Sequence, residues 1–168
     1  MSRVIKIYSN KANYNSFKKR DVRDIKGIVV HYTGIDNDTA ENEGNYFKNN
    51  VVKASAHYFI DRNGIIVKSV PYTNVAWSVE TPGMKLKGFL NNSNTVSIEL
   101  CNFKKYKTIS KKQKESLIWL IKYLRKRMPN CTQLVRHYDI CGKICPANLI
   151  DEAKWNKFIT EVWKWATI

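Results

Sequence analysis

The segment GIVVHYTG, residues 27–34, decides how the fold of this sequence of 168 residues is interpreted. Its β-branched run ends at Thr33-Gly34, which is typical of a buried strand that passes into a loop. His31, one of only three histidines in the chain, stands at the end of this predicted strand. A single strand histidine is usually a packed residue, so its role depends on what the rest of the chain brings to it.

Strand signals continue on both sides of the next predicted helix. SAHYFIDRNGIIVKSV (55–70) predicts two strands joined by a tight turn, in which Gly64 supplies a positive φ. NTVSIELCNF (94–103) predicts another strand by its alternation of apolar and polar residues. This alternation places Glu99 on the face opposite the aliphatic side chains.

Three helices are predicted between and after these strands. Capping-box spacings begin the first two, at Asp38 with Glu41 and at Ser110 with Gln113, and the last helix follows Asp151. The apolar faces comprise Leu117, Ile121, Leu124 and Met128 in the second helix, and Trp155, Phe158, Ile159, Val162 and Ala166 in the third. Interleaved helices and strands indicate an α/β fold, with a central mixed β-sheet flanked by α-helices.

Length and composition indicate one globular domain over residues 1–168. The hydrophobic share is 43%, yet no apolar run approaches the ~20 residues of a membrane span. The basic N-terminal segment lacks the apolar stretch of a signal peptide. We therefore expect a protein that is made in the cytoplasm without a signal peptide and is not inserted in a membrane. Its four cysteines are expected to be thiols or metal ligands rather than disulfides.

The chain is strongly basic, with 29 Lys+Arg against 14 Asp+Glu and a formal net charge of +15. Such a charge indicates an anionic partner, which could be nucleic acid or a cell envelope, although a merely solvated surface is an equally weighted alternative. No nucleic-acid-binding motif is present, so we expect no nucleic-acid partner. We expect the protein to be a monomer.

The stretch RHYDICGKICP (136–146) concentrates metal-capable side chains. His137 follows the strand-like run QLVR, so the ends of adjacent strands could bring His137 and Cys145 to His31. Two imidazoles and a thiolate suit Zn²⁺, and Glu99 could serve as the base for its water. A thiol nucleophile, a disulfide between the two cysteines and a buried loop without chemistry remain alternatives.

These segments resemble the type 2 N-acetylmuramoyl-L-alanine amidases, zinc amidases that share a fold with peptidoglycan recognition proteins and occur in many phage endolysins. The resemblance covers about residues 25–160. IVVHYTG is similar to the first-ligand strand, and SAHYFIDRNGIIVKSVPYTNVAWS to the hairpin and loop that wall the substrate groove. NTVSIEL is similar to the strand of the catalytic glutamate, and RHYDICGKICP to the closing motif.

The resemblance implies a set of site residues. The zinc ligands would be His31, His137 and Cys145; the catalytic residues would be Glu99, Lys143 and His57; and Tyr32, Trp77 and Asn148 would line the groove. The sequence departs from the family at two places. Some members hold a tyrosine in place of His57, and relatives often have a histidine in place of Ser78.

The implied reaction is hydrolysis of the amide between N-acetylmuramic acid and L-alanine of the stem peptide of peptidoglycan. A phage or prophage endolysin, or an autolysin, of a Gram-positive host would act in this way, reaching the wall through a permeabilised membrane. Anionic wall polymers such as teichoic acid would attract its basic surface. A non-catalytic peptidoglycan-binding module of the same fold, or a cysteine peptidase, is the alternative.

Overall fold

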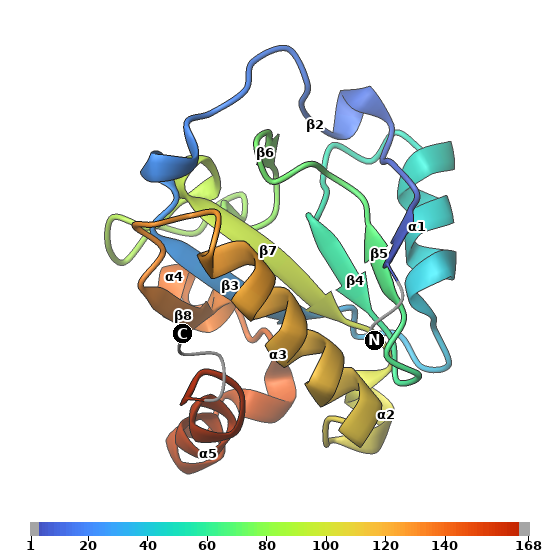
Figure 1. The fold of residues 1–168 in the computed structure, drawn as a ribbon, viewed down its shortest axis with the longest axis vertical. Coiled ribbons are helices and arrows are strands. Elements are labelled where there is room, and N and C mark those ends of the chain that lie inside the picture. Colours follow the sequence, from blue (N-terminus) through green and yellow to red (C-terminus); the bar gives the residue numbers. More distant parts are fainter. Residues whose placement is uncertain (1–3, 165–168) are drawn as a thin grey trace.

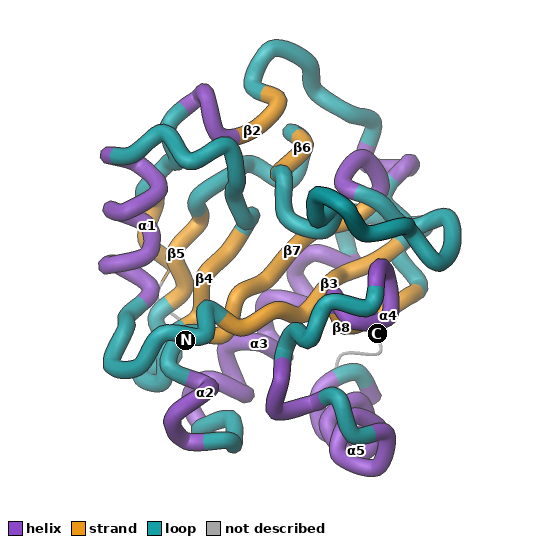
Figure 2. Tube along the Cα trace, turned by 180° about the vertical axis from the view of Figure 1, so that it is seen from behind, coloured by secondary structure: helices purple, strands orange, loops and turns teal. Residues whose placement is uncertain are grey.

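The computed structural model describes residues 4–164 and contains a central sheet with helices on both faces (Figures 1 and 2). The sheet has six strands in the order β1-β5-β4-β7-β3-β8. Their bounds are Val4–Lys6 (β1), Ile66–Lys68 (β5), Tyr58–Ile60 (β4), Thr95–Leu100 (β7), Gly27–Tyr32 (β3) and Gln133–Arg136 (β8). Only β4 and β5 are antiparallel among these neighbours. The predicted mixed sheet is therefore confirmed.

The helices divide between the two faces of this sheet. On one face lie α3 (Lys111–Arg125) and α5 (Glu152–Val162), and on the other lie α1 (Ala40–Asn49) and α4 (His137–Cys141). The remaining elements are α2 (Phe103–Tyr106), the small sheet of β2 (Tyr14–Asn15) and β6 (Val75–Ala76), and 3₁₀ turns at Lys11–Asn13, Val22–Asp24, Asn92–Asn94 and Ala147–Leu149. Within the described residues, no helix combines the length and apolar character needed to cross a bilayer.

Alternation along β3 separates the main core from the functional face. Ile28 and Val30 are fully buried in the core beneath α3 and α5. Val29 points the other way and packs with α4 residues. Because successive side chains of a strand point to opposite faces, His31 lies on the same side as Val29. The central strand thus contributes its apolar side chains to the core and its histidine to the α1–α4 face.

The predicted hairpin is confirmed. Gly64 has φ +82°, and a Cβ there would come within 2.9 Å of Ser116 Oγ. The carboxylate of Asp61 accepts hydrogen bonds from the backbone N–H groups of Asn63 and Ile65. Positive φ and a side-chain acceptor are the features that such a turn needs.

The capping predictions are only partly right. Thr39, and not Asp38, caps α1, because its hydroxyl accepts the N–H of Asn42 at 3.1 Å. Ser110 caps α3 as predicted. The Gln113 side chain does not complete the capping box, because its amide is buried and donates to the carbonyls of Ile60 and Cys101.

The two predicted apolar helix faces contact the main core. In α3 and the turn after it, Leu117, Ile121, Leu124 and Met128 are buried, as are Trp155, Phe158 and Val162 of α5, while Ile159 is partly buried. Ala166 lies outside the described residues.

Candidate active site

The register of the central strands brings two predicted site residues together. β3 and β7 run parallel, with His31 directly opposite Glu99. His31 Nδ1 lies 3.9 Å from Glu99 Oε1. Because neighbouring parallel strands end at the same edge of a sheet, a histidine and a carboxylate far apart in the sequence meet there.

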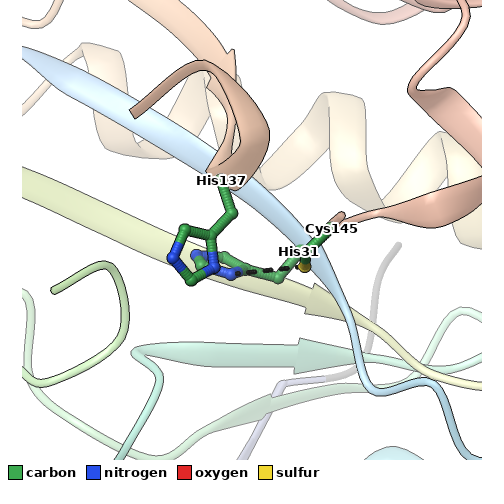
Figure 3. A group of neighbouring side chains, drawn as sticks. All are labelled: His31, His137 and Cys145. Atoms are coloured by element: carbon green, nitrogen blue, oxygen red, sulfur yellow. Dashed lines mark hydrogen bonds between the residues drawn. The ribbon is translucent and has the colours of Figure 1, made fainter. Parts of the chain in front are cut away.

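The end of β8 supplies two further groups. β8 pairs with β3 on its other side and passes directly into α4, which begins at His137, where the sequence predicted a loop. Beyond α4 the chain returns and places Cys145 Sγ 3.8 Å from His31 Nδ1. One ligand-type atom from each of these three residues lies within 4.8 Å of the others (Figure 3). Each of the three is at most 5% exposed.

Hydrogen bonding fixes the tautomer of one potential ligand. His137 Nε2 lies 3.1 Å from the carbonyl of Val79, and since a carbonyl only accepts, Nε2 carries the proton. His137 Nδ1 and His31 Nε2 are buried and have no hydrogen-bond partner within residues 4–164. Buried polar atoms are almost always satisfied, so the unpaired atoms fit a centre that a metal ion would complete.

Burial also sets the charges of these groups. It lowers the pKa of His31 well below its usual value and that of His137 to about 4, with Lys143 adding repulsion in both cases. It raises the pKa of the Cys145 thiol to about 12 and that of the Glu99 carboxyl to about 8. Neutral imidazoles are the metal-binding form. Two nitrogens and one sulfur form a donor set that suits Zn²⁺.

A buried arginine ties the segments around α4 together. Arg136 is 3% exposed. It donates to Asp139 Oδ1 and to Glu152 Oε1, both at 2.6 Å. It also donates to the backbone carbonyls of residues 149 and 150, at 2.9 and 3.0 Å. The guanidinium therefore connects the start of α4 with the segment that follows Cys145.

His31 and Cys145 of this cluster line a cavity of about 750 Å³. Tyr32, Trp77, Glu99 and Lys143 all line it, which is the location that the family resemblance implies for them. The walls also include residues 33–38 and 54–56, four residues of α1 (Asn42, Glu43, Tyr46 and Phe47), Phe59, Ser78 and Ile144. The cavity thus extends from the potential ligands to helix α1.

His57 does not line this cavity, contrary to its predicted catalytic role. Its ring is fully buried, and Nδ1 accepts the backbone N–H of Ser97 at 3.0 Å. Nε2 must then carry the proton, and it lies 3.1 Å from the carbonyl of Asn74. Burial and the neighbouring Arg20 hold the pKa of His57 well below its usual value. Both nitrogens are occupied, so His57 is a packed residue without a free site for proton transfer.

Asn148 is also misplaced by the sequence-based prediction. It lines a separate cavity of about 530 Å³, next to α2 and α5. Its side-chain amide donates to the carbonyl of Phe103 at 2.6 Å. The 3₁₀ turn at Ala147–Leu149 directs this side chain away from the larger cavity.

The acidic residues that α1 and the loop before it contribute to the cavity wall were not predicted from the sequence. Glu43 and Asp38 are only 8% and 7% exposed. The available signal was helical spacing, because Glu43 lies among Ala40, Gly44 and Phe47 on the face that packs against the sheet. An acidic residue at such a position is unusual.

The other cysteines have packing positions. All four cysteines are free thiols. Cys141 packs with Val29 and Ile140 on the α4 face, while Cys101 and Cys131 are buried in other clusters. Neither a disulfide nor a second cysteine in the ligand cluster is present among the described residues.

Comparisons with known proteins find relatives that align with most of this chain. The chain is 30% identical over 161 residues to the N-acetylmuramoyl-L-alanine amidase CwlL of Bacillus licheniformis, covering 89% of this chain and 44% of the relative. The chain therefore spans less than half the length of that relative. The structure of PlyL superimposes with a TM-score of 0.72 at 26% identity, covering 96% of each chain. The solution structure of the PlyG catalytic domain, at 23% identity, shares the fold with a TM-score of 0.77 and covers 98% of this chain and 96% of its own.

The family assignment rests on most of the chain. Residues 21–148 match the N-acetylmuramoyl-L-alanine amidase family, and this range includes the three potential metal ligands and Glu99. Together with the alignment to CwlL, this match establishes that the chain belongs to the N-acetylmuramoyl-L-alanine amidase family.

Proposed function

We propose that this chain is a zinc-dependent hydrolase of peptidoglycan that cleaves the amide between N-acetylmuramic acid and L-alanine of the stem peptide. The observation that carries the proposal is the buried cluster of His31, His137 and Cys145 next to Glu99. Two of these potential ligands and Glu99 line one cavity. Membership of the amidase family supports the choice of this bond.

The side chains in the cavity suit amide hydrolysis. Bound by the three ligands, Zn²⁺ would supply Lewis-acid polarisation of the scissile carbonyl and acidification of a water molecule. Glu99 would take the proton of the attacking water and deliver it to the leaving nitrogen. Lys143 would donate to the oxyanion, a contact of a kind often worth ~10²–10³ in rate. Tyr32 and Trp77, both half-buried in the wall, would position the substrate.

The strongly positive net charge and the membership of the amidase family support a role at the cell wall. We infer a monomeric catalytic domain of a phage or prophage endolysin or an autolysin, which meets the wall after the membrane has been permeabilised. The net charge of +15 would hold it on anionic wall polymers such as teichoic acid. Lysis should then weaken steeply as salt is raised from low to physiological concentration, whereas salt-independent lysis would contradict this role for the charge.

The two alternatives are less well supported. A cysteine peptidase needs a readily ionised thiol, but burial raises the pKa of Cys145 to about 12. A non-catalytic recognition module does not need the third ligand or the carboxylate beside it, and this chain has both Cys145 and Glu99.

The test is zinc content together with release of free alanine amine from purified walls, before and after chelation. We expect one zinc per chain, loss of activity with chelator and its recovery with Zn²⁺. Cys145→Ser should lose both zinc and activity, whereas Cys141→Ser, an equally buried control, should retain both. Bound zinc without amine release would identify a recognition module. Activity that survives chelation and stops on thiol alkylation would identify a cysteine peptidase.

A further inference from the structure

The wall of the cavity formed by α1 and the loop before it is acidic. The cavity lining includes four carboxylates, Asp36, Asp38, Glu43 and Glu99, and only one lysine, Lys143. The chain as a whole has a formal net charge of +15, so the excess of acidic residues at this cavity is a local feature. A local excess of this kind suggests a cationic ligand. The lysine and the acids come from different segments: Lys143 is two residues before the potential ligand Cys145, whereas Glu43 belongs to α1.

Glu43 is an acid of this wall whose carboxylate has no partner among the described residues. Glu43 is only 8% exposed. Its carboxylate nevertheless has no hydrogen bond or ion pair with any residue of the described chain. Asp38 accepts the hydroxyl of Thr33 through Oδ2, while its Oδ1 is buried without a hydrogen-bond partner among the described residues. Burial, followed by repulsion from Asp38, raises the pKa of Glu43 to about 7. Buried carboxylates are normally paired, so a free one at a cavity wall indicates that the ligand brings the partner.

The helix that carries Glu43 is held rigidly. Gly44 lets α1 approach the sheet closely, since a Cβ there would lie 2.8 Å from Val67 Cγ1 and 3.1 Å from Ile7 Cβ. Phe47, one turn further along, stacks on Phe59 with a centroid distance of 5.4 Å. The carboxylate is therefore presented from a fixed backbone, as a specificity contact requires.

We propose that Glu43, assisted by Asp38, binds the free side-chain amino group of a diamino acid in the stem peptide. The inference rests on the proposed function, which puts the L-alanine amide at the Glu99 end of the cavity. Further stem residues extend about 3.3–3.6 Å each, and a cavity of about 750 Å³ is large enough for a short peptide. An ammonium group offers three donors to the two carboxylates.

The proposal defines a substrate preference. A free amino group is cationic, whereas the same nitrogen acylated in a cross-link is neutral and carries one N–H. The enzyme should therefore prefer stem peptides that are not cross-linked through this amine. A charge-assisted contact of this kind corresponds to a preference of roughly 10-fold or more.

The experiment compares two muramoyl tripeptides, N-acetylmuramoyl-L-Ala-D-Glu-L-Lys with a free side-chain amine and its side-chain N-acetyl derivative. We expect the wild type to hydrolyse the free amine with a kcat/KM about 10-fold higher. Glu43→Gln should reduce this ratio to about 1, because the loss of the carboxylate lowers kcat/KM more for the free-amine substrate than for the acetylated one. Glu41→Gln, the same change on α1 away from the cavity lining, should keep the wild-type ratio.

A wild-type ratio near 1, or a preference that survives in Glu43→Gln, would overturn the inference. Binding of the free tripeptide L-Ala-D-Glu-L-Lys, measured by calorimetry, requires no turnover. It therefore distinguishes failure of the amine site from failure of the proposed hydrolytic function. Binding that is weakened about 10-fold by side-chain acetylation and by Glu43→Gln supports the amine site even if the muramoyl amide is not cleaved. Binding that is indifferent to both changes contradicts it.

Discussion

Replacing Arg136 with lysine should loosen the ligand-bearing end of the molecule without changing its charge. The guanidinium contacts Asp139, Glu152 and the carbonyls of residues 149 and 150 at the same time. A lysine ammonium is a single point with three donors, so it cannot bridge partners on opposite sides of a planar fork. We expect the carboxylate contacts to be partly kept and the carbonyl contacts to be lost.

The magnitude follows from the burial of each partner. The side chains of Asp139 and Glu152 are 29% and 68% exposed, so water can replace much of what they lose. The carbonyls of residues 149 and 150 accept hydrogen bonds from Arg136, which is only 3% exposed, so water cannot easily replace it. A hydrogen bond from a charged group contributes about 1.5–3 kcal/mol to the free energy of unfolding. Arg136→Lys should therefore reduce the free energy of unfolding by about 2–4 kcal/mol. Because the lost bonds hold the backbone around the ligands, zinc affinity should fall about 10–100-fold.

The assay combines urea denaturation in the presence of chelator with a competitive zinc titration of the folded protein. Arg127→Lys is the control, since that arginine is exposed and its guanidinium interacts, among residues 4–164, with Tyr123, to whose carbonyl it donates and over whose ring it lies. Its unfolding free energy should remain within about 0.5 kcal/mol of the wild type. An equally small change for Arg136→Lys, with unchanged zinc affinity, would refute the reasoning.

Three further variants test the site and the fold. Glu99→Gln should retain zinc but lose at least about 10²-fold in kcat for amine release, and undiminished turnover would exclude Glu99 as the proton carrier. The pKa of Glu43 is about 7 in the folded protein, above its value in the unfolded chain. The folded state therefore binds this proton more tightly, and the stability that it contributes at acidic pH is lost as the pH rises through 7. Glu43→Gln should accordingly gain about 1–2 kcal/mol over the wild type between pH 4 and pH 8, measured by urea denaturation. Gly64→Ala should cost about 2 kcal/mol, because φ is +82° and the new Cβ meets Ser116 Oγ and Lys112 O, and a neutral thermal shift would contradict this.

Periodicity predicted the parts of the site that belong to strands. The alternation in β7 placed Glu99 correctly on the polar face, and the β-branched run ending in His31 predicted the central strand. Residues whose position depends on tertiary contacts were less predictable. His57 is buried because both of its ring nitrogens form hydrogen bonds with backbone groups of segments distant in the sequence. The turn at residues 147–149 directs the side chain of Asn148 to another cavity. Glu43 was overlooked because only the docking of α1 makes its surroundings a cavity wall.

The position of β3 affects the chain while it is being synthesised. As the polypeptide leaves the ribosome, GIVV emerges long before either of its neighbours, since β7 begins at Thr95 and β8 at Gln133. Until both have been made, an apolar strand has unpaired backbone edges that can pair with other chains. The last two potential ligands follow β8, so tight metal capture would be the final event of folding. A domain truncated before residue 133 should therefore accumulate in inclusion bodies and bind zinc no better than an unfolded peptide.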